Sequence, residues 1–63
     1  MPSTNEVLHV SVTIEGLVHY GTYRVEGGTV YVESPFGSKT SQVGSLPPKD
    51  VARLLLSELV RGR

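Results

Sequence analysis

The sequence contains no cysteine and no tryptophan, and neither sign of charge is in excess. Without cysteine, disulfides and zinc sites with thiolate ligands are excluded, so two common ways of stabilising a very small fold are missing. Six basic and six acidic side chains give a formal net charge of zero. The large positive excess that is typical of proteins binding nucleic acid or anionic membranes is therefore absent.

Long apolar runs are also missing. No stretch approaches the roughly 18 apolar residues of a membrane-spanning helix, and the opening residues MPSTNE lack the basic start and apolar run of a secretory signal. We therefore expect a soluble protein of the cytoplasm that has no membrane partner.

The short chain limits the size of the core. Its 63 residues have room for one domain, residues 1–63, of which we expect residues 1–6 to be disordered. Burial of apolar surface in a protein of this size contributes on the order of 90 kcal/mol, and ordering the chain costs about 95 kcal/mol. Because the two terms nearly cancel and no covalent link stabilises the monomer, we expect a homo-oligomer, and a homodimer first.

Three segments have the composition of β-strands. Residues 8–14 (LHVSVTI) alternate apolar and polar side chains, which is typical of a strand with one buried face. Residues 17–25 and 29–34 are rich in β-branched and aromatic residues. Glu15-Gly16 and Gly27-Gly28 separate the three segments and predict two tight turns.

The remaining residues predict a further strand and one helix. SPFGS (34–38) predicts another turn, and the polar residues 39–43 predict a short edge strand. Prolines and Asp50 then mark a helix start, so we expect a helix from about 48 to 61. The predicted fold class is α+β: an antiparallel meander of three to four strands with one C-terminal helix packed on one face.

Two-residue loops fix the register of the first three strands, because a slip by one residue would turn every side chain to the other face. The core face then carries Leu8 opposite Tyr23, Val10 opposite Gly21, Val25 opposite Val30, and Tyr23 opposite Val32. The other face carries His9 opposite Thr22, Ser11 opposite Tyr20, and Arg24 opposite Tyr31.

This second sheet face is the candidate binding surface. Its aromatic and basic residues could stack on bases or bind a protein, and we take as candidate site residues His9, Tyr20, Arg24, Tyr31 and Lys39. The competing interpretation is a solvated face that only supports strand packing, in which Arg24 over Tyr31 is a cation–π pair.

The helix provides a second candidate surface. A broad apolar stripe of the helix faces the sheet and comprises Val51, Ala52, Leu55, Leu56 and Leu59. Leu54 projects from the polar side, and Val60 lies at the margin of the stripe. A single exposed leucine is ordinary, but with so thin a core we take Leu54 and Val60 as the candidate dimer interface. Pairing of an edge strand, residues 8–14 or 39–43, is the other route to a dimer.

Catalytic patterns are not found in the sequence. The only histidines, His9 and His19, point to opposite faces in the predicted register, so a shared metal or a proton relay is disfavoured. There is no nucleophile motif, phosphate loop or pair of carboxylates at a useful spacing. We expect no enzyme activity, no metal and no cofactor.

The stretches YRVEGGTVYV and KTSQVGSLPPKDVARLLL carry a resemblance that covers roughly residues 20 to 60. Their order of strand, turn, strand and helix resembles the DNA-binding domains of plant AP2-type factors and the arm-binding domains of phage integrases. The resemblance implies a sheet that reads DNA with the face away from the helix. On this chain that face would carry Tyr20, Arg24, Tyr31 and Lys39.

Two classes of function therefore follow from the sequence. The favoured one is a small homo-oligomeric interaction or regulatory module, because the net charge is zero and the helix has a surplus leucine. The alternative is a nucleic-acid-binding domain that uses the sheet face opposite the helix.

Overall fold

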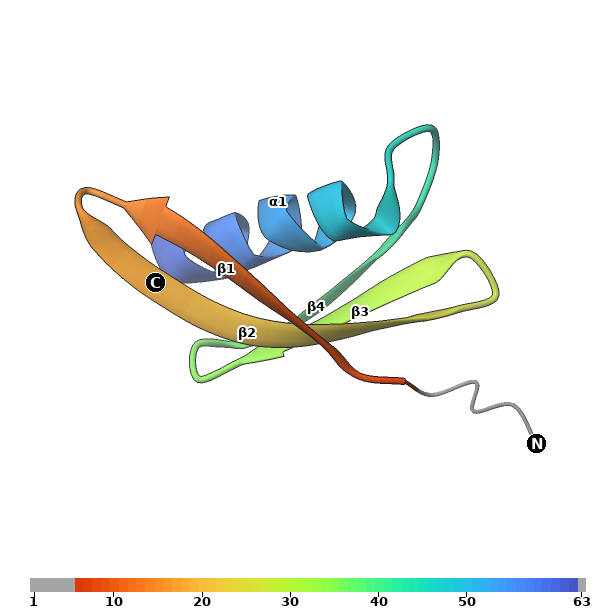
Figure 1. Cartoon of the computed structure of the whole chain (residues 1–63), viewed down its shortest axis with the longest axis horizontal. Helices are drawn as coiled ribbons and strands as arrows, with labels where there is room; N and C mark the ends of the chain where they lie inside the picture. The colour runs from red at the N-terminus through yellow and green to blue at the C-terminus, as the bar shows by residue number, and fades with distance from the viewer. Residues whose placement is uncertain (1–5, 63) are drawn as a thin grey trace.

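The computed structural model describes residues 6–62. It contains one four-stranded antiparallel sheet in the order β1-β2-β3-β4, followed by one helix (Figure 1). The elements are β1 (Leu8–Ile14), β2 (Leu17–Glu26), β3 (Thr29–Ser34), β4 (Gly37–Gln42) and α1 (Pro48–Arg61). The predicted α+β meander with a C-terminal helix is confirmed. The prediction of disorder concerns mainly residues 1–5, which lie outside the described residues.

Every strand pair predicted for the first three strands is present. Leu8 lies opposite Tyr23, Val10 opposite Gly21, and Val25 opposite Val30. The two predicted loops set this register: Glu15 and Gly16 have φ values of 54° and 81°, and Gly27 and Gly28 have the same values. Two successive residues with positive φ form a turn whose twist matches that of the flanking strands.

Helix α1 covers one face of the sheet (Figure 1). Pro48 occupies the first turn, where the missing N–H leaves no hydrogen bond unmade, and Asp50 lies near the positive end of the helix dipole. At the other end the Gly62 N–H donates to the Glu58 carbonyl oxygen at 2.8 Å. These local features start and end the helix at the predicted positions.

The core lies between α1 and the sheet and is small. Among residues 6–62, the buried hydrophobic residues are Val10, Tyr23, Val30, Val32, Val51, Ala52, Leu55 and Leu56. Four of these residues come from the predicted stripe on the helix, and Leu59 is packed against them. The stripe prediction is confirmed, and the small number of buried residues agrees with the expected thin core.

Gly21 allows the helix to approach the sheet. A Cβ atom on this residue would lie 2.9 Å from the Glu33 carbonyl oxygen and 3.2 Å from Cδ1 of Leu56. Leu56 is completely buried. The absence of a side chain at position 21 therefore permits α1 to approach β2 closely, since any other residue would overlap its neighbours.

Candidate interaction surface

The open face of the sheet, the face opposite α1, is arranged as the sequence predicts. His9 lies opposite Thr22, Ser11 opposite Tyr20, and Arg24 opposite Tyr31. His9, Tyr20, Arg24 and Tyr31 thus share one face of the sheet. The prediction for these four residues is confirmed as a placement, and their binding role stays a prediction.

The charges of this face nearly cancel. Arg24 stands beside Glu26, with Nε 3.3 Å from a carboxylate oxygen, and its guanidinium lies over the Tyr31 ring at 4.5 Å from the centroid. Glu33 adds a second carboxylate to the face, opposite Thr22. The Glu26 carboxylate thus offsets part of the Arg24 charge and occupies one of the five N–H donors of its guanidinium.

Lys39 is not part of the open face, so its predicted placement is wrong. It lies opposite Val32, which faces the core, and its Nζ bonds Glu58 of α1 at 2.6 Å. The loop between β3 and β4 pairs Ser34 with Gly37, which sends Lys39 to the helix side. A strand as polar as β4 has no alternation of hydrophobic residues that would reveal this register in the sequence.

The two edges of the sheet differ in chemistry. β1 and β4 both lie at an edge, and an unpaired edge strand offers backbone groups to another chain. β4 (GSKTSQ) is polar and contains Lys39, the kind of charged residue that discourages pairing. β1 (LHVSVTI) contains no lysine, proline or acidic residue, and three of its seven residues are β-branched and apolar. Its edge is the one suited to pairing.

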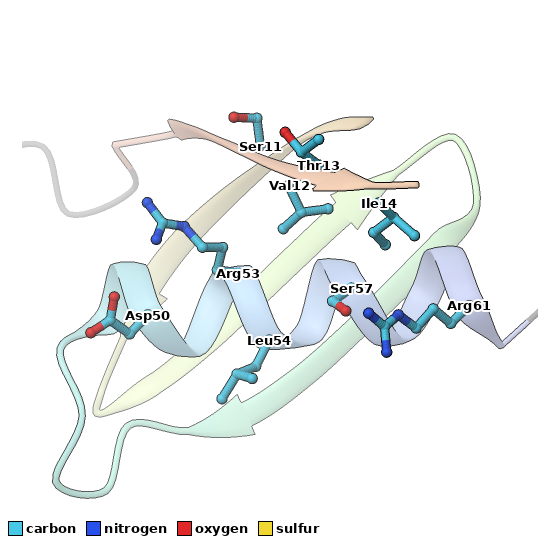
Figure 2. Close-up of a pocket in the computed structure, with 9 residues that line it drawn as sticks. All are labelled: Ser11, Val12, Thr13, Ile14, Asp50, Arg53, Leu54, Ser57 and Arg61. Atoms are coloured by element: carbon cyan, nitrogen blue, oxygen red, sulfur yellow. The ribbon is translucent and has the colours of Figure 1, made fainter. Parts of the chain in front are cut away.

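A hollow of about 710 Å³ runs between β1 and α1 (Figure 2). Val12 and Ile14 point from β1 toward the helix, whereas Ser11 and Thr13 point away from it. The helix lines the hollow with Asp50, Arg53, Leu54, Ser57 and Arg61. The free edge of β1 therefore borders a space that is partly apolar and partly basic.

Leu54 and Val60 make a poor interface by themselves. Leu54 is 55% exposed, as predicted, but the outer side of α1 around it carries Asp50, Ser57 and Arg61. Val60 is half-buried and packs against the core. Contact through this side of the helix would therefore bury one leucine per copy among polar groups, which gives little free energy of association.

Sequence reasoning did not assign Lys49 or Arg53 to a site. The two are four residues apart, so they share one side of α1, and together with His9, Val10, Ser11 and Tyr20 they line a hollow of about 200 Å³ at the β1 edge. The helical spacing was visible in the sequence. That this side of the helix faces β1 depends on how α1 lies on the sheet.

The two histidines lie on opposite faces of the sheet. His19 lies opposite Val12 on the helix face, with its ring edge-on to Phe36 at 5.5 Å, whereas His9 is on the open face, so the predicted separation is confirmed. Within residues 6–62, no group of three or more His, Cys, Asp or Glu side chains could hold a metal ion. The helix in this part of the chain is neither long nor apolar enough to cross a bilayer.

No known family matches the chain. Comparison with curated proteins and with solved structures likewise gave no match. The resemblance to AP2-type and integrase arm-binding domains thus stays a prediction, and the case for a function depends on the surfaces described above.

Proposed function

We propose that the protein is a small homo-oligomeric interaction module, and that two copies pair through the free edge of β1. The observation that supports this most directly is the edge itself: seven residues, LHVSVTI, without a charged residue or proline, on the outside of the sheet. Natural edge strands that stay unpaired usually carry such protective residues. β1 lacks them and β4 has one.

The backbone of β1 is suited to pairing with its own copy. Ile14 and Leu17 flank a two-residue loop, so they exchange hydrogen bonds, and such pairs alternate along the ladder. The N–H and C=O groups of His9, Ser11 and Thr13 consequently point away from β2. Two antiparallel β1 strands centred on Ser11 would pair His9 with Thr13 twice and Ser11 with itself, giving about six hydrogen bonds.

The side chains are compatible with the same arrangement. A twofold axis that relates two antiparallel neighbouring strands is perpendicular to the sheet, so both helices would lie on the same face of an eight-stranded sheet. Val10 of one copy would then lie opposite Val12 of the other on the helix face, where cross-strand pairs of β-branched residues are favourable. The small core, with eight buried hydrophobic residues among residues 6–62, adds a reason to associate.

Sedimentation of the wild type between about 1 and 200 µM tests the proposal, with a dissociation constant expected on the order of 10 µM for an interface of this modest size. Ser11→Pro removes an outward N–H from β1 without breaking the β1–β2 ladder, so it should give a monomer. Thr40→Pro is the matched control, because the Thr40 N–H points outward from the other edge by the same reasoning.

Three further variants keep the test decisive. If Ser11→Pro fails to fold, Ser11→Lys and its control Thr40→Lys place like charges at one edge each. Leu54→Lys should leave the dimer intact. A wild type that is monomeric throughout the range refutes the proposal, and a dimer that is lost only in Leu54→Lys moves the interface to the helix.

The nucleic-acid alternative has less support. The open face has Arg24 and His9 as basic residues and Glu26 and Glu33 as acidic ones, whereas phosphate contacts from cations supply most of the affinity for nucleic acids. Titration of the folded protein with duplex and single-stranded DNA at low salt tests this alternative. Chemical shifts that stay unchanged on the open face would exclude it.

A further inference from the structure

Two cations lie beside the centre of the proposed dimer contact. Lys49 and Arg53 line the 200 Å³ hollow together with Ser11, and Arg53 also lines the larger hollow between β1 and α1. In Figure 2 the guanidinium of Arg53 points from the helix toward β1. Neither cation takes part in a salt bridge within residues 6–62. The acidic residue closest in the chain, Asp50, lines the larger hollow.

Pairing of two β1 strands would bring both sets of cations together. In the register centred on Ser11, the two Ser11 residues form a hydrogen-bonded pair with their Cα atoms about 5.5 Å apart. Because both helices lie on the same face of the paired sheet, the sides of α1 that carry Lys49 and Arg53, which border Ser11 in each copy, face each other across the two β1 strands. Lys49 and Arg53 of both copies then lie on either side of the twofold axis, and their four positive charges outnumber the two negative charges of the Asp50 carboxylates.

We infer that the β1-paired dimer has a binding site for an oligophosphate at its twofold axis, formed by Lys49 and Arg53 of both copies. This inference rests on the proposed dimer. Neither copy holds the complete site, because each contributes only half of the cations.

The chemistry of the four cations favours an oligophosphate over simpler anions. The guanidinium offers a planar set of donors that matches phosphate oxygens, and the ammonium offers a compact charge on a flexible stem. A chain of linked phosphates has several charged oxygens and can reach cations on both sides of an axis. A chloride ion or a single carboxylate neutralises one cation and leaves the others in mutual repulsion.

Binding at such a site must strengthen dimerisation, since a ligand that binds only the dimer shifts the equilibrium toward it. Without the anion, repulsion between the cations opposes pairing and is screened by salt. Saturating oligophosphate should therefore lower the dissociation constant about tenfold, by the linkage relation for a ligand at roughly ten times its own dissociation constant. The same anion should have no effect once the cations are removed.

The test is sedimentation of the full chain with and without inorganic tripolyphosphate, at an ionic strength held constant with sodium chloride. The variant is Lys49→Gln with Arg53→Gln. Its matched control is Arg24→Gln with Lys39→Gln, which removes the same charge from β2 and β4. We expect tripolyphosphate to tighten the wild-type and control dimers about tenfold and to leave the Lys49/Arg53 variant unchanged.

A second arm replaces tripolyphosphate with ATP. Equal effects of the two support an inorganic oligophosphate, and a stronger effect of ATP supports a nucleotide. A wild-type dimer that ignores both anions, or a variant that responds as the wild type does, overturns the inference and leaves the dimer standing. A wild type that is monomeric with and without anion overturns the dimer and the inference together.

Discussion

Substitution of Gly21 by alanine should destabilise the protein, although alanine normally stabilises a strand relative to glycine. The new Cβ would lie 2.9 Å from the Glu33 carbonyl oxygen and 3.2 Å from Cδ1 of Leu56. The first neighbour is backbone of the adjacent strand β3. The second is a side chain with no exposed surface, so neither can move aside without disturbing the sheet or the core.

The size of the effect follows from two opposing contributions. Overpacking of a close-packed site costs about 1 to 3 kcal/mol, and the lower entropy of the unfolded alanine chain returns about 0.4 to 1 kcal/mol. We expect a net loss of about 1 to 2 kcal/mol in the free energy of unfolding, since the contact with a backbone atom cannot relax by rotation of a side chain. For a domain of this size the loss lowers Tm by about 5 to 15 °C.

Thermal unfolding followed by circular dichroism measures the change, at one protein concentration for all variants because dimerisation would add to the apparent stability. Leu56→Val is the companion variant, since it removes the Cδ1 atom that the new Cβ would meet. In that background the penalty of Gly21→Ala should fall by about half, as contacting residues do not behave additively. A Gly21→Ala protein as stable as the wild type would refute the close approach of α1 to β2.

Three smaller predictions concern positions outside the core. Glu15 has a φ of 54° without being glycine, so Glu15→Asn should raise the free energy of unfolding by about 0.5 to 1 kcal/mol; an unchanged or lower Tm would contradict this. Lys39→Gln should lower the free energy of unfolding, measured with urea, by less than about 0.5 kcal/mol, because the side chains of Lys39 and Glu58 are 44% and 58% exposed. A decrease above about 1 kcal/mol would show a stronger ion pair. Tyr31→Leu should move the Arg24 Nε–H resonance downfield in the NMR spectrum, because it removes the ring beneath the guanidinium. An unchanged chemical shift would show that Arg24 does not lie over the Tyr31 ring.

Local features of the sequence determined most of the fold. Two positive-φ turns at Glu15-Gly16 and Gly27-Gly28 fixed the loop lengths, and the alternation in residues 8–14 fixed which face of β1 is buried. Together these two features specify every pairing of the first three strands, because the side-chain period of a strand is two. Prolines and spaced apolar residues placed the helix in the same way.

The candidate surfaces were only partly determined by the sequence. Register alone placed His9, Tyr20, Arg24 and Tyr31 on one face. It could not place Lys39, because β4 is polar on both sides and nothing in its composition marks a buried face. The exposure of Leu54 on the polar side of the helix follows from helical periodicity alone.

Only the tertiary structure decided which edge of the sheet lies beside which side of α1. Lys49 and Arg53 are four residues apart on α1 in any helical arrangement, yet their position beside Ser11 of β1 depends on how the helix lies across the sheet. That placement results from the packing of the buried stripe against all four strands, including the close approach at Gly21. Contacts between segments some 40 residues apart depend on the shape of the whole core, and no local pattern in the sequence specifies that shape.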